Sequence, residues 1–201
     1  MLMVVTLHVL LFGLKYQEIV VFSTKWHITH LLESLCFCAV NIYAMITGYV
    51  LVNGKTKIKR IVMLWLEVVF YLLLSATLMK FFYPAQCGIS TFIKSIIPVI
   101  TSQYWYFTAY FIMFWFIPLY NWIINNLSFQ QFRKFIFTVL SVFGFLGWIA
   151  SLIDGREFGL VAGYSYLWIS VMYFIGAGIK KYGLNIFYIK KNISQRLILC
   201  T

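Results

Sequence analysis

The chain has 201 residues, of which 63% are hydrophobic and only 10% charged, and its formal net charge is +11. So few charged side chains cannot cover the surface of a soluble globule, which excludes the ordinary soluble classes. The apolar stretches run unbroken for about 20 residues, the length at which a helix crosses a ~30 Å hydrocarbon core, whereas a β-barrel has shorter alternating segments. We therefore predict an all-α fold, a polytopic transmembrane bundle forming one domain over residues 1–201.

Six apolar stretches are the expected spans. In chain order they are Leu2–Leu14, Ser34–Val52, Ile61–Met79, Tyr104–Ile124, Phe135–Ile153 and Phe158–Ile179. A helix that starts at Met1 and stops before Lys15 reaches only about 21 Å, so the first stretch is too short to cross. A new apolar stretch starts at Ile193, shortly before the last residue, and no signal peptide is recognisable at the start. We expect about six spans in a bundle truncated at both ends.

The positive charges follow the loops rather than one surface. Every second loop is basic: Lys55, Lys57, Lys59 and Arg60, then Arg133 and Lys134, then Lys180, Lys181, Lys190 and Lys191. By the positive-inside rule these loops face the cytoplasm, whereas the loops with Lys25, Lys80, Lys94 and Asp154 face outward. This placement favours a multi-pass plasma (inner) membrane protein with a cytoplasmic N-terminus, in contact with the lipid bilayer, and it argues against a nucleic-acid partner.

His8 is the first candidate for a functional residue, because an ionisable side chain inside an apolar span is costly to insert. Burial disfavours the imidazolium, so a neutral ring could accept a proton as a general base. The alternative is a polar contact between helices. Glu67 and Asn41 likewise have one functional and one purely structural interpretation. Glu67 could line a site or reach back to Arg60, and Asn41 could line a substrate path or bond another helix.

His27 and His30 are spaced so that a helical turn would bring both rings to one side, as metal ligands sometimes require. No third ligand is evident, and two outer-loop histidines beside charged residues are more often interfacial. The four cysteines suggest neither a disulfide framework nor a metal cluster. We therefore expect no metal site.

Three stretches, in this order, resemble the acyltransferase 3 family of integral-membrane acyltransferases. The first is Met3–His8, similar to the end of the family's first helix, where a histidine follows an arginine by about three helical turns. The second is Asn41–Leu51, in which Thr47-Gly48-Tyr49 resembles the family's Ser-Gly-Phe/Tyr segment ahead of a basic loop. The third is Gln103–Phe107, with Tyr104 and Trp105, followed by Tyr110 and Pro118.

The resemblance covers nearly all of this chain and the N-terminal part of a family member. It implies transfer of an acyl group, usually acetyl, from cytoplasmic acyl-CoA to a hydroxyl of a cell-surface glycan or polysaccharide, with no bound cofactor. His8 would be the catalytic base, and the residues that line the site would be Asn41, Thr47, Gly48, Tyr49, Glu67, Tyr104 and Trp105. The arginine that partners the histidine would precede Met1, and Thr47 stands where the family has serine.

Two other interpretations stay open. Polar residues in several spans, such as Asn41, Glu67 and Gln103, could line the path of a small transporter or flippase, although internal repeats and paired broken helices are not evident. The short first span and the abrupt end also fit an inactive fragment of an acyltransferase.

Overall fold

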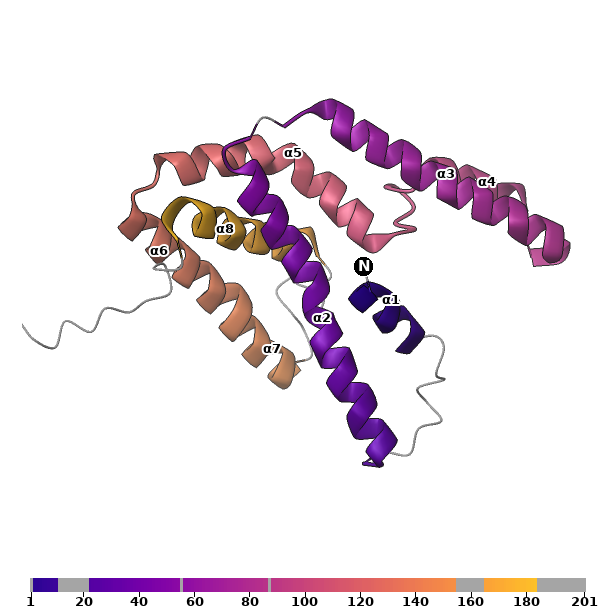
Figure 1. The fold of residues 1–201 in the computed structure, drawn as a ribbon, viewed down its shortest axis with the longest axis horizontal. Coiled ribbons are helices and arrows are strands. Elements are labelled where there is room, and N and C mark those ends of the chain that lie inside the picture. Colours follow the sequence, from indigo (N-terminus) through magenta and orange to yellow (C-terminus); the bar gives the residue numbers. More distant parts are fainter. Residues whose placement is uncertain (1, 11–21, 55, 87, 155–164, 184–201) are drawn as a thin grey trace, which may run out of the picture.

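A computed structural model describes residues 2–10, 22–54, 56–86, 88–154 and 165–183, and all regular elements in these ranges are helices (Figure 1). Four helical runs are long and apolar enough to cross a membrane: α2 (Thr24–Leu51), α3 (Ile58–Phe82), α5 (Trp105–Asn126) and Phe129–Ala150. The last run comprises α6 (Phe129–Val139), the π-helical segment η4 (Leu140–Leu146) and the first part of α7 (Gly147–Asp154). The shorter elements are α1 (Leu2–His8), the 3-10 turn η3 (Pro84–Gln86), α4 (Ile89–Ile96) and α8 (Tyr166–Tyr182).

These helices confirm the predicted all-helical fold in the described part of the chain and are consistent with a multi-pass membrane protein. The expected number of six spans stays a prediction. In the first expected span, the α-helix described is α1, with seven residues. In the last, α8 has 17 residues, about 26 Å of helix. The apolar stretch after Ile193 lies outside the described residues.

Serine residues start three of the helices by accepting a hydrogen bond from an otherwise unpaired backbone N–H. Ser23 Oγ accepts from Trp26 N at 3.2 Å at the start of α2, and Ser165 Oγ accepts from Trp168 N at 3.3 Å at the start of α8. Ser128 forms a reciprocal capping box with Gln131 ahead of α6. The Ser23 cap explains why α2 begins well before Ser34, where the predicted span began, so that residues expected in an outer loop lie on a helix.

The core is built around α8, and Figure 1 shows it enclosed by α2, α5 and α6. Every residue from Ile169 to Gly178 is buried, and the Tyr173 side chain is fully covered. By contrast, α3 packs chiefly against α4 and extends away from α8, as Figure 1 also shows. Its outward side chains are large and apolar, among them Leu66, Phe70 and Leu74. Such a surface suits contact with lipid rather than with water.

A proline lies inside α5, shortly before the residues of this helix that contact α8. Pro118 has no N–H, so the carbonyl of Phe114 lacks its usual helical donor, which favours a bend in the helix. Tyr120 and Asn121, two and three residues later, carry the polar side chains that reach α8. Pro118 therefore lies shortly before the part of α5 that binds the core helix.

Candidate functional site

His8 ends α1, which packs against α2 and has one buried side chain, that of Leu7. The histidine side chain itself is exposed, so the burial from which a neutral ring was predicted is not found. Its Nδ1 lies 2.8 Å from the carbonyl oxygen of Val4, one turn earlier. A carbonyl oxygen can only accept, so this contact requires the proton to be on Nδ1. The neutral ring in this tautomer carries its basic lone pair on Nε2. If the ring is neutral, this contact leaves Nε2 as the nitrogen that can accept a proton.

The four predicted site residues on α2 have different surroundings. Asn41 is half-buried, and its Oδ1 accepts a hydrogen bond from Trp168 Nε1 of α8 at 3.0 Å. Thr47 is also half-buried and donates its hydroxyl to the Tyr43 carbonyl of its own helix at 2.9 Å. Tyr49 is exposed. Asn41 was expected either to line a substrate path or to bond another helix. The contact described for it is the bond to another helix.

Gly48 is buried where α2 and α8 touch. A Cβ at Gly48 would overlap the carbonyl of Tyr173, and a Cβ at Gly176 would overlap the carbonyl of Met45. Ala44, one turn before Gly48, is also fully buried. Small residues at this spacing let two membrane helices approach backbone to backbone, so the contact gives Gly48 a packing role.

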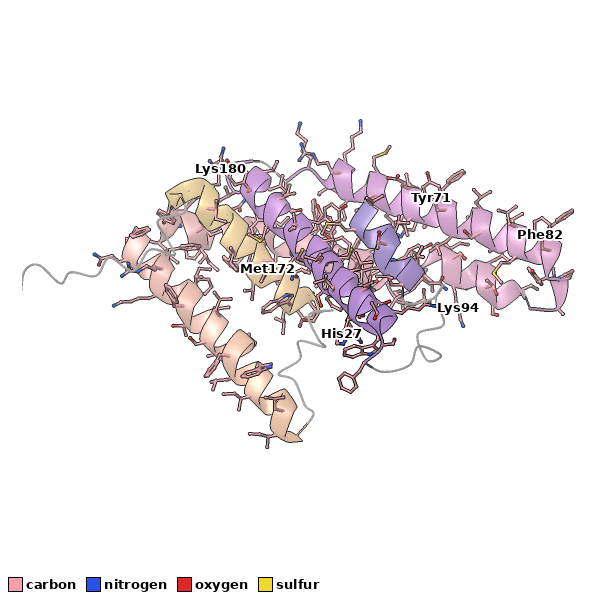
Figure 2. All side chains as sticks on the ribbon, turned by 60° about the horizontal axis from the view of Figure 1, so that its bottom comes forward. His27, Tyr71, Phe82, Lys94, Met172 and Lys180 are labelled. Atoms are coloured by element: carbon pink, nitrogen blue, oxygen red, sulfur yellow. The ribbon has the colours of Figure 1, made fainter. Side chains whose placement is uncertain are left out.

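The order of the contacts shows that α2 and α8 run parallel. Asn41 meets Trp168, and further along both chains Tyr49 meets Lys180. Figure 2 shows His27, near the start of α2, and Lys180, near the end of α8, at opposite ends of this pair. The helix ends that carry the basic residues therefore lie together, as the alternating loop charges predicted.

A polar network that the sequence did not reveal joins α5 to α8 and α2. The Tyr173 hydroxyl donates to Asn121 Oδ1 at 2.7 Å, and Asn121 Nδ2 donates to the Leu51 carbonyl at the end of α2 at 2.9 Å. One turn of α8 earlier, the Tyr120 hydroxyl donates to Ser170 Oγ at 3.0 Å, which in turn donates to the Tyr166 carbonyl at 2.6 Å. These bonds satisfy buried polar groups and fix three helices relative to one another.

The basic end of the bundle has its own contacts. Lys181 Nζ donates to the carbonyls of Ile124 and Asn125 at 2.6 and 3.2 Å, where the last turn of α5 leaves carbonyls without a helical partner. The Tyr182 hydroxyl donates to the Leu127 carbonyl at 2.6 Å. Lys180 Nζ instead lies 4.7 Å from the centre of the Tyr49 ring. Lys181 and Tyr182 hold α5 to α8, whereas Lys180 remains exposed.

The other predicted site residues lie on different elements. Glu67 is exposed on α3. Tyr104 is the exposed residue before α5, and Trp105, which begins that helix, packs edge-on against Tyr106. Glu67 therefore lies on α3 and Tyr104 and Trp105 at the start of α5, whereas His8 ends α1. A site combining them stays a prediction.

The N-terminal end of α2 gathers aromatic and ionisable side chains. The Trp26 ring lies edge-on against the rings of His27 and His30, with centroid distances of 5.0 and 4.2 Å. His30 Nδ1 lies 3.2 Å from Glu33 Oε2. Among the described residues, no three histidine, cysteine, aspartate or glutamate side chains are grouped so that they could hold a metal ion. A tryptophan beside charged groups at a helix end is typical of the membrane interface.

Comparison of the chain with models of protein families, with curated proteins and with solved structures gives no match.

Proposed function

We propose that the protein is a membrane O-acyltransferase that transfers an acyl group, most simply acetyl, from acyl-CoA to a hydroxyl of a cell-surface glycan. The proposal rests on the three stretches that resemble the acyltransferase 3 family. The observation that supports its chemistry is the 2.8 Å contact between His8 Nδ1 and the Val4 carbonyl. It leaves Nε2 as the basic nitrogen of the neutral ring, the state that a general base needs.

In the proposed reaction, His8 Nε2 takes the proton of the acceptor hydroxyl while the hydroxyl oxygen attacks the thioester carbonyl carbon. The C–S bond then breaks, and the thiolate of CoA leaves and receives a proton from the imidazolium. The products are an acyl ester of the glycan and free CoA. A thioester is already activated, so a single well-oriented base supplies most of what the protein must add.

The test uses membrane vesicles from bacterial cells that express the full chain, supplied with radiolabelled acetyl-CoA. Transfer is measured as label in the cell-envelope polymer fraction that mild alkali releases, because alkali cleaves esters. We expect His8→Gln to lower transfer at least a hundredfold, since an amide keeps hydrogen bonding but has no basic nitrogen. His27→Gln, on the exposed outer turn of α2, is the matched control and should transfer normally.

Two results would count against the proposal. Transfer that survives in His8→Gln removes His8 from the mechanism. Wild-type vesicles that add no alkali-labile label, although the protein is present in the membrane at normal levels, argue against acyl transfer by this chain.

A further inference from the structure

Lys180 and Tyr49 form an exposed pair where α2 and α8 end together. The ammonium group lies 4.7 Å from the centre of the tyrosine ring, close enough for a cation–π contact that limits where the flexible lysine can go. The two helix backbones meet at Gly48, next to Tyr49, and at Gly176, one turn before Lys180, so the pair adjoins a tightly packed contact. The charge is therefore held at a defined place on the surface.

The described segments at this end of the bundle carry basic residues and no acidic ones. The sequence has no aspartate or glutamate in the segments 49–60, 122–134 and 178–183, where α2, α5 and α8 end and where α3 and α6 begin. Among the described residues, the partner of the Lys180 charge is an aromatic ring and not a carboxylate. An anion from outside the chain would complement this charge.

An apolar stripe on α2 leads directly to this pair. Ile42, Ile46 and Val50 follow one another at four-residue spacing, and all three are exposed, at 42%, 52% and 61%. Residues four apart lie on the same face of a helix. The stripe ends one residue past Tyr49, itself 44% exposed, so an apolar surface and a fixed positive charge adjoin at the end of the span.

We propose that this surface binds an anionic phospholipid, with the headgroup phosphate at Lys180 and Tyr49 and an acyl chain along Ile42, Ile46 and Val50. The lysine supplies charge and N–H donors, and the Tyr49 hydroxyl supplies a further donor. A phospholipid can contact both the charged pair and the apolar stripe, whereas a soluble phosphate compound can contact only the charged pair. The proposal does not depend on acyl transfer by His8.

The experiment is native mass spectrometry of the purified full chain in detergent, with dioleoylphosphatidylglycerol or dioleoylphosphatidylcholine added as probes. We expect the anionic lipid to be retained preferentially by the wild type. Lys180→Gln should lower that retention about fivefold, the effect of one lysine charge near an anionic headgroup, and Lys180→Arg should preserve it. Lys94→Gln is the matched control, because this exposed lysine lies on α4, and it should bind as the wild type does. Equal retention of the two lipids, or unchanged retention in Lys180→Gln, overturns the proposal.

A second arm separates a lipid from a soluble phosphate ligand. Dihexanoylphosphatidylglycerol has the same headgroup and short chains, so it should bind more weakly than the dioleoyl lipid. Replacing Ile42, Ile46 and Val50 together by alanine should reduce retention of the dioleoyl lipid and leave the short-chain lipid unaffected. Displacement of the dioleoyl lipid by an equal concentration of inorganic phosphate or CoA would show that the phosphate alone is recognised, which also overturns the proposal.

Discussion

Gly176 of α8 lies against the backbone carbonyl of Met45 of α2, so closely that no side chain fits between them. Gly48 stands in the same relation to the Tyr173 carbonyl, so each helix contributes one glycine to the crossing. Membrane helices lack a strong hydrophobic force between them and depend on such close contact. The crossing is therefore the main packing contact of α2 with the core.

Gly176→Ala should destabilise the protein by about 1–3 kcal/mol, because the added methyl forces the two backbones apart. The measurement is unfolding by sodium dodecyl sulfate in mixed micelles, followed by circular dichroism. Gly144→Ala is the control: a Cβ there meets open space, so it should cause no loss. Equal stability of the two variants would mean that the helices do not approach as described.

Tyr173→Phe should destabilise the bundle by about 1 kcal/mol, because Asn121 Oδ1 then loses its donor in a buried place. Tyr83→Phe, at an exposed tyrosine after α3, is the control and should be neutral. The same unfolding assay reports both. If Tyr173→Phe is also neutral, the network between α5 and α8 makes no net contribution.

The bond between Asn41 and Trp168 can be tested with a double-mutant cycle. Asn41→Leu leaves the indole N–H of Trp168 without its acceptor and should cost about 1 kcal/mol. Trp168→Phe combined with Asn41→Leu removes the donor as well, so the two effects should not add. Additive losses of stability would show that the two side chains act independently. If Asn41→Leu lowered acyl transfer without lowering stability, Asn41 would instead be assigned to the substrate path.

The orientation in the membrane can be tested by labelling single cysteines with a membrane-impermeant maleimide, in a variant with all four native cysteines replaced by serine. With the N-terminus in the cytoplasm, Lys94→Cys should react in intact cells. Lys180→Cys should react only after permeabilisation, because the basic loops face inward. The reverse pattern would show that the bundle has the opposite orientation.

Much of the fold was predictable because long apolar stretches have few other ways to satisfy their backbone in lipid. The expected spans at Ile61–Met79 and Tyr104–Ile124 lie within a few residues of α3 and α5. The start of α2 was misplaced because Lys25 to Glu33 is polar enough to suggest a loop. The signals that were present are the capping Ser23 and the four-residue spacing of Trp26 and His30.

The contacts between helices could not be predicted in the same way. Nothing in the local sequence says which face of α5 meets α8, so Asn121 and Tyr173 were not singled out, although an amide and a tyrosine in apolar spans are a recognisable signal. Gly48 was noticed for its resemblance to a family motif. Its small neighbour Ala44, four residues earlier, was the signal for helix packing. A site that His8 shares with Glu67 or Trp105 stays a prediction.

The central position of α8 has a consequence for how the chain is made. Its partners Asn41 and Asn121 precede Trp168 and Tyr173 by 127 and 52 residues, so they leave the ribosome well before α8 exists. Until α8 is inserted, both amides lack the partners that they have in the folded bundle. The earlier helices therefore cannot reach their final arrangement before that point. The contacts that join the described helices therefore form only after α8 has been made, and a stop codon before α8 would leave inserted helices without the element that joins them.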